Sequence, residues 1–294
     1  MSFHMSFKKK QNVILFTTVY PGIENYFMDF VKSVNSQDDK NFELVIVNDN
    51  FTNLDKYLPK LRFNKIHIFC PKKSPEKNRI YGIKKCIDLK ADIIIFGDSD
   101  DAFSNNRVSE TIRYFDNTNL DVLINDINVC DSEMNQLKKS YISARIKHHS
   151  PVTQNSIRHF NFCGLSNSAI KADICNVDEI IAINPFDWAF FTMLFLKGAK
   201  AIFTNKIKTL YRQHNKNFVG IGHNLNDDRI KKAIEIKLNH YKKINSISRE
   251  FDDLIDFYEC VLSMNKKEFN SYKQKCFKEY KENSLWWEEA MNWS

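Results

Sequence analysis

The chain has 294 residues, of which 43% are hydrophobic and 13% aromatic, and no long polar or repetitive tract interrupts it. This composition excludes an intrinsically disordered chain, and the length suits one large domain or one domain with an appendage. The formal net charge of +7 leaves anionic ligands and anionic surfaces among the candidate partners.

Apolar runs that predict buried strands alternate with segments whose apolar side chains recur at helical spacing. In the first hundred residues the predicted strands are 13–16, 42–47, 65–69 and 92–96, and the predicted helices are 27–34 and 79–89. Strands that alternate with helices in this way predict an α/β fold with a mostly parallel sheet.

The second half of the chain is less regular. A strand is predicted at 121–129, a helix from Pro185 to Gly198 and a strand at 201–203, and the polar region between 130 and 160 is expected to form loops. Amphipathic patterns with few turn signals then predict a helical C-terminal extension. We therefore expect an α/β catalytic domain over 1–222 and a helical extension over 223–294.

Seven scattered cysteines without a Cys-X-X-Cys pair argue against a disulfide scaffold and against structural zinc. The N-terminal ten residues lack the apolar core of a signal peptide, and the most apolar stretch, 188–196, is shorter than the roughly 20 residues that span a bilayer. The expected location is the cytoplasm, either free or peripheral at the inner face of the membrane.

Polar residues follow three of the predicted strands: Thr18, then Asp49, then Asp98, Asp100 and Asp101. Ligands of open parallel sheets bind beyond the carboxyl ends of the strands. Three crowded acids repel one another, and a bound cation relieves that repulsion. Mn²⁺ or Mg²⁺ held by one or two carboxylates keeps positions for phosphate oxygens. The alternative is an acidic turn that only caps the next helix.

Four segments, in this order, resemble motifs of family 2 glycosyltransferases. They are Ser33-Val34-Asn35-Ser36-Gln37, Phe42-Glu43-Leu44-Val45-Ile46-Val47-Asn48-Asp49, Arg79-Ile80-Tyr81-Gly82-Ile83 and Asp98-Ser99-Asp100-Asp101. The resemblance implies the GT-A fold, a Rossmann-like nucleotide-binding sheet flanked by helices, and an inverting enzyme of bacterial glycan biosynthesis. Two positions depart from the family pattern, because Asn48 replaces the first acid of an Asp-Asp pair and Ile80 replaces an Asn.

The same resemblance implies a donor site for a nucleotide-diphosphate sugar, with a UDP-sugar favoured. Asp49 would contact the nucleobase, Arg79 the base and ribose, and Asp98 the ribose. Asp100 would ligate Mn²⁺ or Mg²⁺, and Thr18 would pack along the base.

Asn184-Pro185-Phe186-Asp187-Trp188 falls where the family carries Glu-Asp before a helix. Phe186 replaces the Glu, and Asp187 corresponds to the expected catalytic base. A carboxylate at a helix start accepts backbone N–H bonds and feels the helix dipole, so it stays ionised and can take a proton. The alternative is that Asp187 only caps this helix.

Tyr211-Arg212-Gln213-His214 resembles a Tyr-Arg-X-His stretch found late in relatives of the family. Arg212 is therefore a candidate contact for the donor pyrophosphate. His214 is a candidate metal ligand, since histidine binds Mn²⁺ well, although a lone His in a polar loop is also an ordinary surface residue.

Two further features concern partners. The basic stretch from 60 to 90 could bind a nucleotide diphosphate or an anionic membrane, or its lysines could simply be solvated at the surface. Nucleic acid is the least expected partner, because no stacking aromatic residues are interleaved with the basic ones. A helix-like stretch at 284–293 holds three tryptophans. We expect it to pack on the catalytic domain or on a second subunit rather than to dock on a membrane.

Together these observations predict metal-dependent, inverting transfer of a hexose-type sugar to a hydroxyl of a glycan or lipid-linked acceptor, with Asp187 as general base. Two alternatives stay open. The missing Glu at Phe186 leaves room for a non-catalytic nucleotide-sugar-binding module. A sugar-phosphate nucleotidyltransferase would share the acidic metal ligands, but no Gly-rich phosphate loop follows the first strand.

Overall fold

The computed structural model describes residues 10–63, 65–214, 225–281 and 283–293. The strands are β1 (Val13–Val19), β2 (Glu43–Asn48), β3 (Ile66–Phe69), β4 (Ile93–Phe96), β5 (Ala102–Phe103), β6 (Val122–Cys130), β7 (Gln136–Lys138), β8 (Pro151–Val152), β9 (Ser168–Lys171) and β10 (Ala201–Arg212). The helices are α1 (Phe27–Asn35), α2 (Pro75–Asp88), α3 (Arg107–Asn117), α4 (Phe186–Leu196), α5 (Asp227–Ser248), α6 (Asp252–Ser263) and α7 (Lys266–Glu279).

The strands form one sheet in the order β3-β2-β1-β4-β9-β6-β10-β5, with β7 beside β6 and β8 beside β10. β3, β2, β1 and β4 run parallel to one another. β9 then runs antiparallel to both β4 and β6, and β10 returns to a parallel pairing with β6 across a bulge between Thr204 and Lys208. The predicted α/β class is confirmed, and the sheet is parallel in its first half and mixed in its second.

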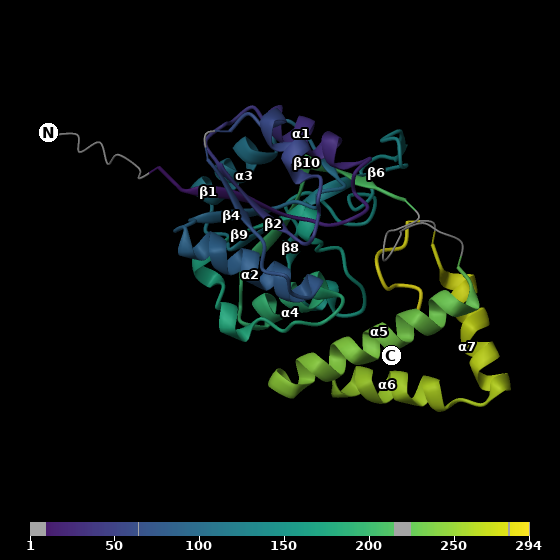
Figure 1. The fold of residues 1–294 in the computed structure, drawn as a ribbon. Coiled ribbons are helices and arrows are strands. Elements are labelled where there is room, and N and C mark those ends of the chain that lie inside the picture. Colours follow the sequence, from purple (N-terminus) through teal and green to yellow (C-terminus); the bar gives the residue numbers. More distant parts are fainter. Residues whose placement is uncertain (1–9, 64, 215–224, 282, 294) are drawn as a thin grey trace, which may run out of the picture.

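Side chains of β1 alternate between two apolar layers because successive residues of a strand point to opposite faces. Val13 and Leu15 belong to the layer that includes residues of α1 and α3. Ile14 and Phe16 belong to the layer that includes residues of α2 and α4. Figure 1 shows these helix pairs on the two sides of the sheet.

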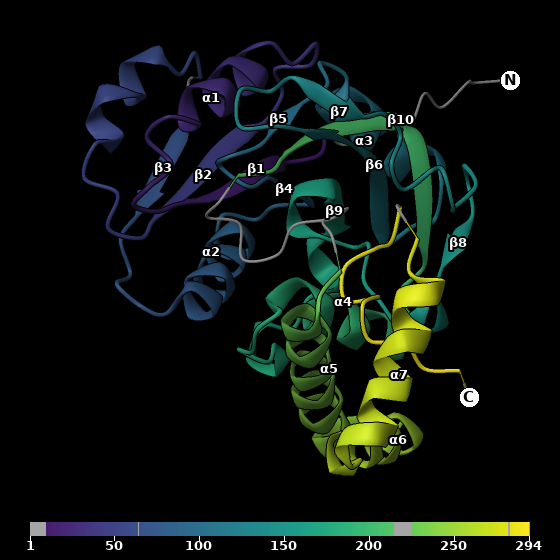
Figure 2. The ribbon, with the colours of Figure 1, turned by 90° about the vertical axis from the view of Figure 1, so that its right-hand side faces the viewer.

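Helices α5, α6 and α7 lie together beyond α4 (Figure 2). The ring of Trp188 on α4 stacks on the ring of His240 on α5, with centroids 4.1 Å apart. The predicted helical extension is therefore present, and its core is continuous with the layer of α2 and α4. The predicted boundary between residues 222 and 223 falls outside the described residues and stays a prediction.

Residues 284–293 do not form the helix that their spacing suggested. They form turns and one isolated bridge, between Trp286 and Asn161. Most of the segment's backbone contacts are with neighbouring elements, as when the Ala290 carbonyl accepts from Lys237 and Tyr258, and one weak turn bond joins the Glu288 N–H to the Leu285 carbonyl. The segment packs on the α/β part of the chain, through Asn161 and Tyr141, which is one of the two positions expected for it.

No helix among the described residues combines the length and the apolar character needed to cross a bilayer.

Candidate active site

A cavity of about 440 Å³ opens where β1, β2 and β4 end, at the carboxyl edge of the sheet. It brings together every residue that the sequence predicted for donor binding and catalysis. These are Thr18, Asp49, Arg79, Asp98, Arg212 and Asp187, and the predicted metal ligand Asp100 also lines the cavity. His214, the other predicted metal ligand, is not in the lining but lies against Asp100. Ligands of open α/β sheets bind at this edge, so the cavity is the candidate active site.

The loop after β4 concentrates negative charge in the cavity. Burial and the neighbouring charge of Asp100 raise the pKa of Asp98 to about 7. Burial, with Asp100 and Asp98 adjacent, also raises the pKa of Asp101 well above its ordinary value, although Ser166 Oγ and the Arg212 N–H donate hydrogen bonds to it. Ionising all these acids together is therefore unfavourable unless a cation binds beside them.

Asp100 and His214, the two residues predicted to bind a metal, lie next to each other. Asp100 Oδ2 lies 3.1 Å from His214 Nε2 and accepts a hydrogen bond of 2.9 Å from the Tyr20 hydroxyl. The ring of His214 stacks on Tyr26, with centroids 4.6 Å apart. Neighbouring ligands of an octahedral ion at about 2.1 Å are roughly 3 Å apart, so the spacing of the pair fits Mg²⁺ or Mn²⁺.

Two side chains are too few to complete the coordination shell of a metal ion. Within the part of the chain that the structure describes, no three His, Cys, Asp or Glu side chains are grouped as a metal site. Mg²⁺ ordinarily binds one or two carboxylates and completes its shell with water and substrate phosphates. The arrangement therefore fits a metal that is held jointly by the protein and a phosphorylated ligand.

Arg212 ends β10 and is almost fully buried at 1% exposure. Its Nε donates to the Asp100 carbonyl at 2.8 Å, and its other nitrogens donate to the Ser132 carbonyl and to Asp29 Oδ2. These contacts hold the acidic loop in place. The direct donor contact predicted for Arg212 stays a prediction, whereas its hydrogen bonds position Asp100.

Asp187 lies in the first turn of α4. Its Oδ1 accepts from the Trp188 N–H at 2.8 Å, and its Oδ2 accepts from Asn161 Nδ2 at 3.3 Å. Burial raises the pKa of Asp187, and the Arg79 guanidinium opposes this. A carboxylate accommodates about four hydrogen bonds, so these two contacts orient the group and leave room for a reacting hydroxyl.

Phe186, which stands where the family pattern has Glu, has a defined partner. The guanidinium of Arg79 lies 6.0 Å from the centre of its ring. A cation over an aromatic face is attracted by the ring quadrupole. Arg79 is thereby placed beside Asp187 and Asp98, both of which feel its charge.

Sequence reasoning missed several residues of the cavity. Tyr20, Ser166, Trp286 and Trp287 line it, and Asn161 binds the predicted base. Asn161 lies just beyond the polar region of 130–160, and the two tryptophans lie about 90 residues beyond the end of α4 in the chain. No local pattern marks such positions, because only long-range contacts bring them to the site.

Comparison with known proteins now identifies the family. A model described as glycosyl transferase family 2 matches residues 15–173, more than half of the chain. The chain belongs to glycosyl transferase family 2. No curated protein gives a significant sequence match.

Solved structures show the same fold. S. aureus TarS 1–349 matches with a TM-score of 0.58 and 16% identity, over 90% of this chain and 79% of that one. The same TarS fragment in complex with UDP-GlcNAc gives a TM-score of 0.57 at 16% identity, over 90% and 80% of the two chains. The mannosyltransferase PcManGT of Pyrobaculum calidifontis, in complex with GDP-Man and Mn²⁺, gives 0.55 at 12% identity, over 86% and 70%. The family and the GT-A fold predicted from the sequence are confirmed.

Proposed function

We propose that this family 2 enzyme transfers a sugar from a nucleotide-diphosphate donor to a hydroxyl of a glycan or lipid-linked acceptor, with inversion at the anomeric carbon. The observation that carries the proposal is the shared cavity, in which Asp187 faces the acidic loop that contains Asp98 and Asp100. One carboxylate is thus available to the acceptor, and a separate acidic group is available to the donor.

In the proposed step the acceptor oxygen attacks the anomeric carbon while its proton passes to Asp187. The bond between that carbon and the nucleotide diphosphate breaks on the opposite side, so a single displacement inverts the configuration. A bound Mn²⁺ or Mg²⁺ supplies charge neutralisation to the departing diphosphate. Asp100 and His214 would hold the ion.

The donor end of the cavity follows the order of the strands. We assign the nucleobase to Asp49 and Thr18 and the ribose to Asp98, with Arg79 beside both. Asp49 is held by its own N–H, which donates to the Val19 carbonyl at 2.8 Å. One solved neighbour is in complex with UDP-GlcNAc and another with GDP-Man and Mn²⁺. We propose UDP as the nucleotide, and a comparison of nucleotides in solution would test which nucleobase is bound.

Calorimetric titration with UDP, GDP, CDP and dTDP, each with and without Mn²⁺, tests the donor site. We expect one nucleotide to bind tightly and only with the metal. Asp100→Ala should weaken that binding at least tenfold, because it removes a carboxylate ligand of the metal that also binds the diphosphate. Asp178→Asn, at an exposed acid outside the cavity, is the matched control and should bind like the wild type.

Asp187→Asn tests the base. It should keep nucleotide binding and lower release of UDP from a nucleotide sugar by a factor of about 10² to 10⁴, the range for loss of a general base. Equal loss of nucleotide binding in Asp100→Ala and Asp187→Asn would refute this division of roles. Nucleotide binding without any turnover in the wild type would favour a non-catalytic binding module.

A further inference from the structure

The segment 284–293 forms part of the cavity wall. Trp286 and Trp287 line the cavity together with Asp187. Trp287 has φ = 69°, a left-handed conformation that is uncommon for a bulky residue. Such backbone geometry persists only where the surrounding contacts impose it, and it is often found at ligand sites.

Contacts from the catalytic part of the chain hold this segment. The Tyr141 hydroxyl donates to the Ser284 carbonyl at 2.7 Å. Both oxygens of Glu288 accept from the Arg145 guanidinium, a two-point contact that restricts rotation as well as distance. The wall is therefore anchored to the loop that carries Tyr141 and Arg145.

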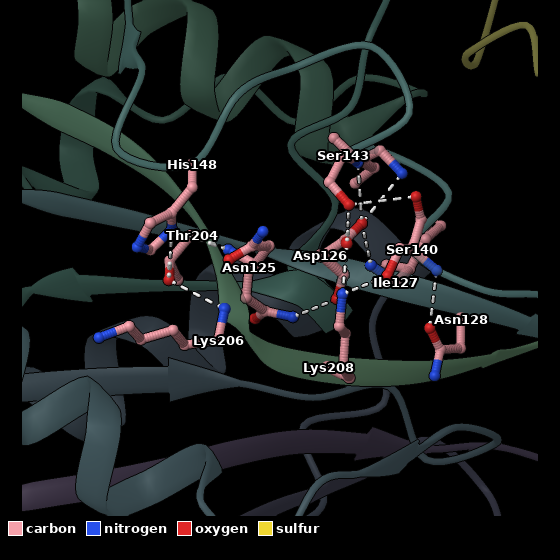
Figure 3. Close-up of polar contacts among 12 residues, drawn as sticks. Asn125, Asp126, Ile127, Asn128, Ser140, Ser143, His148, Thr204, Lys206 and Lys208 are labelled. Atoms are coloured by element: carbon pink, nitrogen blue, oxygen red, sulfur yellow. Dashed lines mark hydrogen bonds and ion pairs between the residues drawn. The ribbon is translucent and has the colours of Figure 1, made fainter.

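That loop is itself fixed by a buried carboxylate, Asp126 of β6. Asp126 accepts from the Ile142 N–H at 2.9 Å, from Ser143 Oγ at 2.6 Å and from Lys208 Nζ at 2.5 Å. Figure 3 shows Ser143 of the loop and Lys208 of β10 both directed at Asp126. A fully satisfied buried network of this kind specifies one arrangement, and it fixes the loop that anchors residues 284–288.

The helical extension holds the other end of the segment. Buried Lys237 of α5 and Tyr258 of α6 both donate to the Ala290 carbonyl, and Arg229 pairs with Glu289. The extension thus positions the tryptophans of the cavity as well as packing on α4.

Asn161 links this wall to the proposed base. Its backbone N–H donates to the Trp286 carbonyl at 2.9 Å, and its Nδ2 donates to Asp187 Oδ2 at 3.3 Å. Trp286 is half-buried, and its ring meets Tyr211 edge-on with centroids 5.5 Å apart. One residue therefore sets the position of Trp286 relative to the carboxylate that would receive the acceptor proton.

We propose that Trp286 is the platform on which the acceptor's sugar ring stacks, and that the acceptor is accordingly a pyranoside. The inference rests on the proposed function, because it takes Asp187 as the base. The acidic loop serves the donor, so the acceptor must approach Asp187 along the remaining wall, where Trp286 lies. The C–H face of a pyranose is apolar, and a large aromatic face adjacent to a few polar groups suits it.

Saturation-transfer NMR tests this assignment with a panel of methyl pyranosides of glucose, galactose, mannose, GlcNAc and GalNAc, in the presence of saturating UDP and Mg²⁺. We expect transfer to the ring C–H protons of at least one pyranoside in the wild type. Trp286→Ala should weaken its binding about fivefold to tenfold, the size of an aromatic contact. Trp286→Phe should restore most of the binding.

The control is Trp293→Ala. Trp293 belongs to the same segment but packs on Tyr272 and Lys275 of α7 and is not part of the cavity lining. It should bind pyranosides as the wild type does, which separates a platform from general damage to the segment. Calorimetry with UDP should give an unchanged affinity for Trp286→Ala.

The outcomes are distinct. Loss of pyranoside binding in Trp286→Ala alone, with UDP binding kept and Trp286→Phe active in binding, supports the platform. Undiminished pyranoside binding in Trp286→Ala, or no pyranoside binding to a wild type that binds UDP, overturns it and leaves the proposed function standing. A wild type that binds no nucleotide overturns both.

Discussion

At the scale of single residues, Asp187 as the proposed general base has to meet two demands. It must be ionised to take a proton, yet a moderately basic carboxylate takes it more readily. Burial raises its pKa, while the hydrogen bond from the Trp188 N–H and the charge of Arg79 oppose the rise. Asn161 Nδ2 donates a further hydrogen bond to its carboxylate. The half-buried position at the start of α4 thus gives a carboxylate that is more basic than an exposed one.

This balance predicts the pH dependence of turnover. Because the pKa of Asp187 is raised and only the ionised form accepts a proton, activity should fall as pH drops through a value above the ordinary range for Asp. Measuring UDP release from the bound nucleotide sugar between pH 4 and 8 would show this acid limb. Asn161→Ala removes a donor to the ionised form, so its limb should move to higher pH.

The Asn161→Ala profile also distinguishes Asp187 from the acids of the metal loop, which Asn161 does not contact among the hydrogen bonds of the described chain. Its thermal unfolding should be recorded alongside, since Asn161 is buried. An acid limb that stays at the wild-type pH in a folded Asn161→Ala would exclude Asp187 as the titrating base.

At the scale of elements, α2 lies unusually close to β1 at Gly82. A Cβ at this position would lie 2.1 Å from Cζ of Phe16, far inside contact distance. Gly82 also belongs to the Arg79–Ile83 motif, so the same close approach that packs the helix sets where Arg79 enters the cavity. Position 82 therefore requires a glycine because there is no space for a Cβ next to Phe16.

Gly82→Ala should therefore destabilise the protein by about 1–3 kcal/mol, the usual cost of overpacking, even though alanine is the better helix former. Urea unfolding measures the change. Lys84→Ala, at an exposed position of the same helix, should stay within about 0.5 kcal/mol of the wild type. If Phe16 is the obstacle, Gly82→Ala should cost less in a Phe16→Leu background. Equal costs in both backgrounds would contradict the steric account.

At the scale of the whole molecule, ligand binding should be coupled to stability. The acids of the loop after β4 repel one another. One hydrophobic core continues from β1 to the C-terminal segment around this loop. A ligand that binds only the folded state stabilises it by about 2.7 kcal/mol at a hundredfold excess over Kd.

UDP with Mn²⁺ should accordingly raise the melting temperature by roughly 5 °C or more, given about 2–4 °C per kcal/mol for proteins of this size. Scanning fluorimetry measures it, with UDP alone and Mn²⁺ alone as controls. The combined ligands should produce a much larger shift than either one. The shift should nearly vanish in Asp100→Ala, and an undiminished shift there would place the metal elsewhere.

The sequence by itself determined the α/β alternation, the family motifs and the residues at the carboxyl ends of β1, β2 and β4. These are local signals, because an apolar run or a helical repeat is contained within about ten neighbouring residues. Strand ends in a parallel sheet meet at one edge, so Thr18, Asp49 and Asp98 could be expected together before the sheet was seen.

Only the tertiary structure decided what surrounds them. Asn161 meets Asp187 and Trp286 through contacts that span 26 and 125 positions of the chain, and Arg212 reaches Asp29 across 183. The segment 284–293 looked helical by spacing, but its carbonyl groups accept hydrogen bonds from α5, α6 and the loop after β7. Such pairings depend on where the folded sheet and helices place distant segments, and no short-range pattern records them.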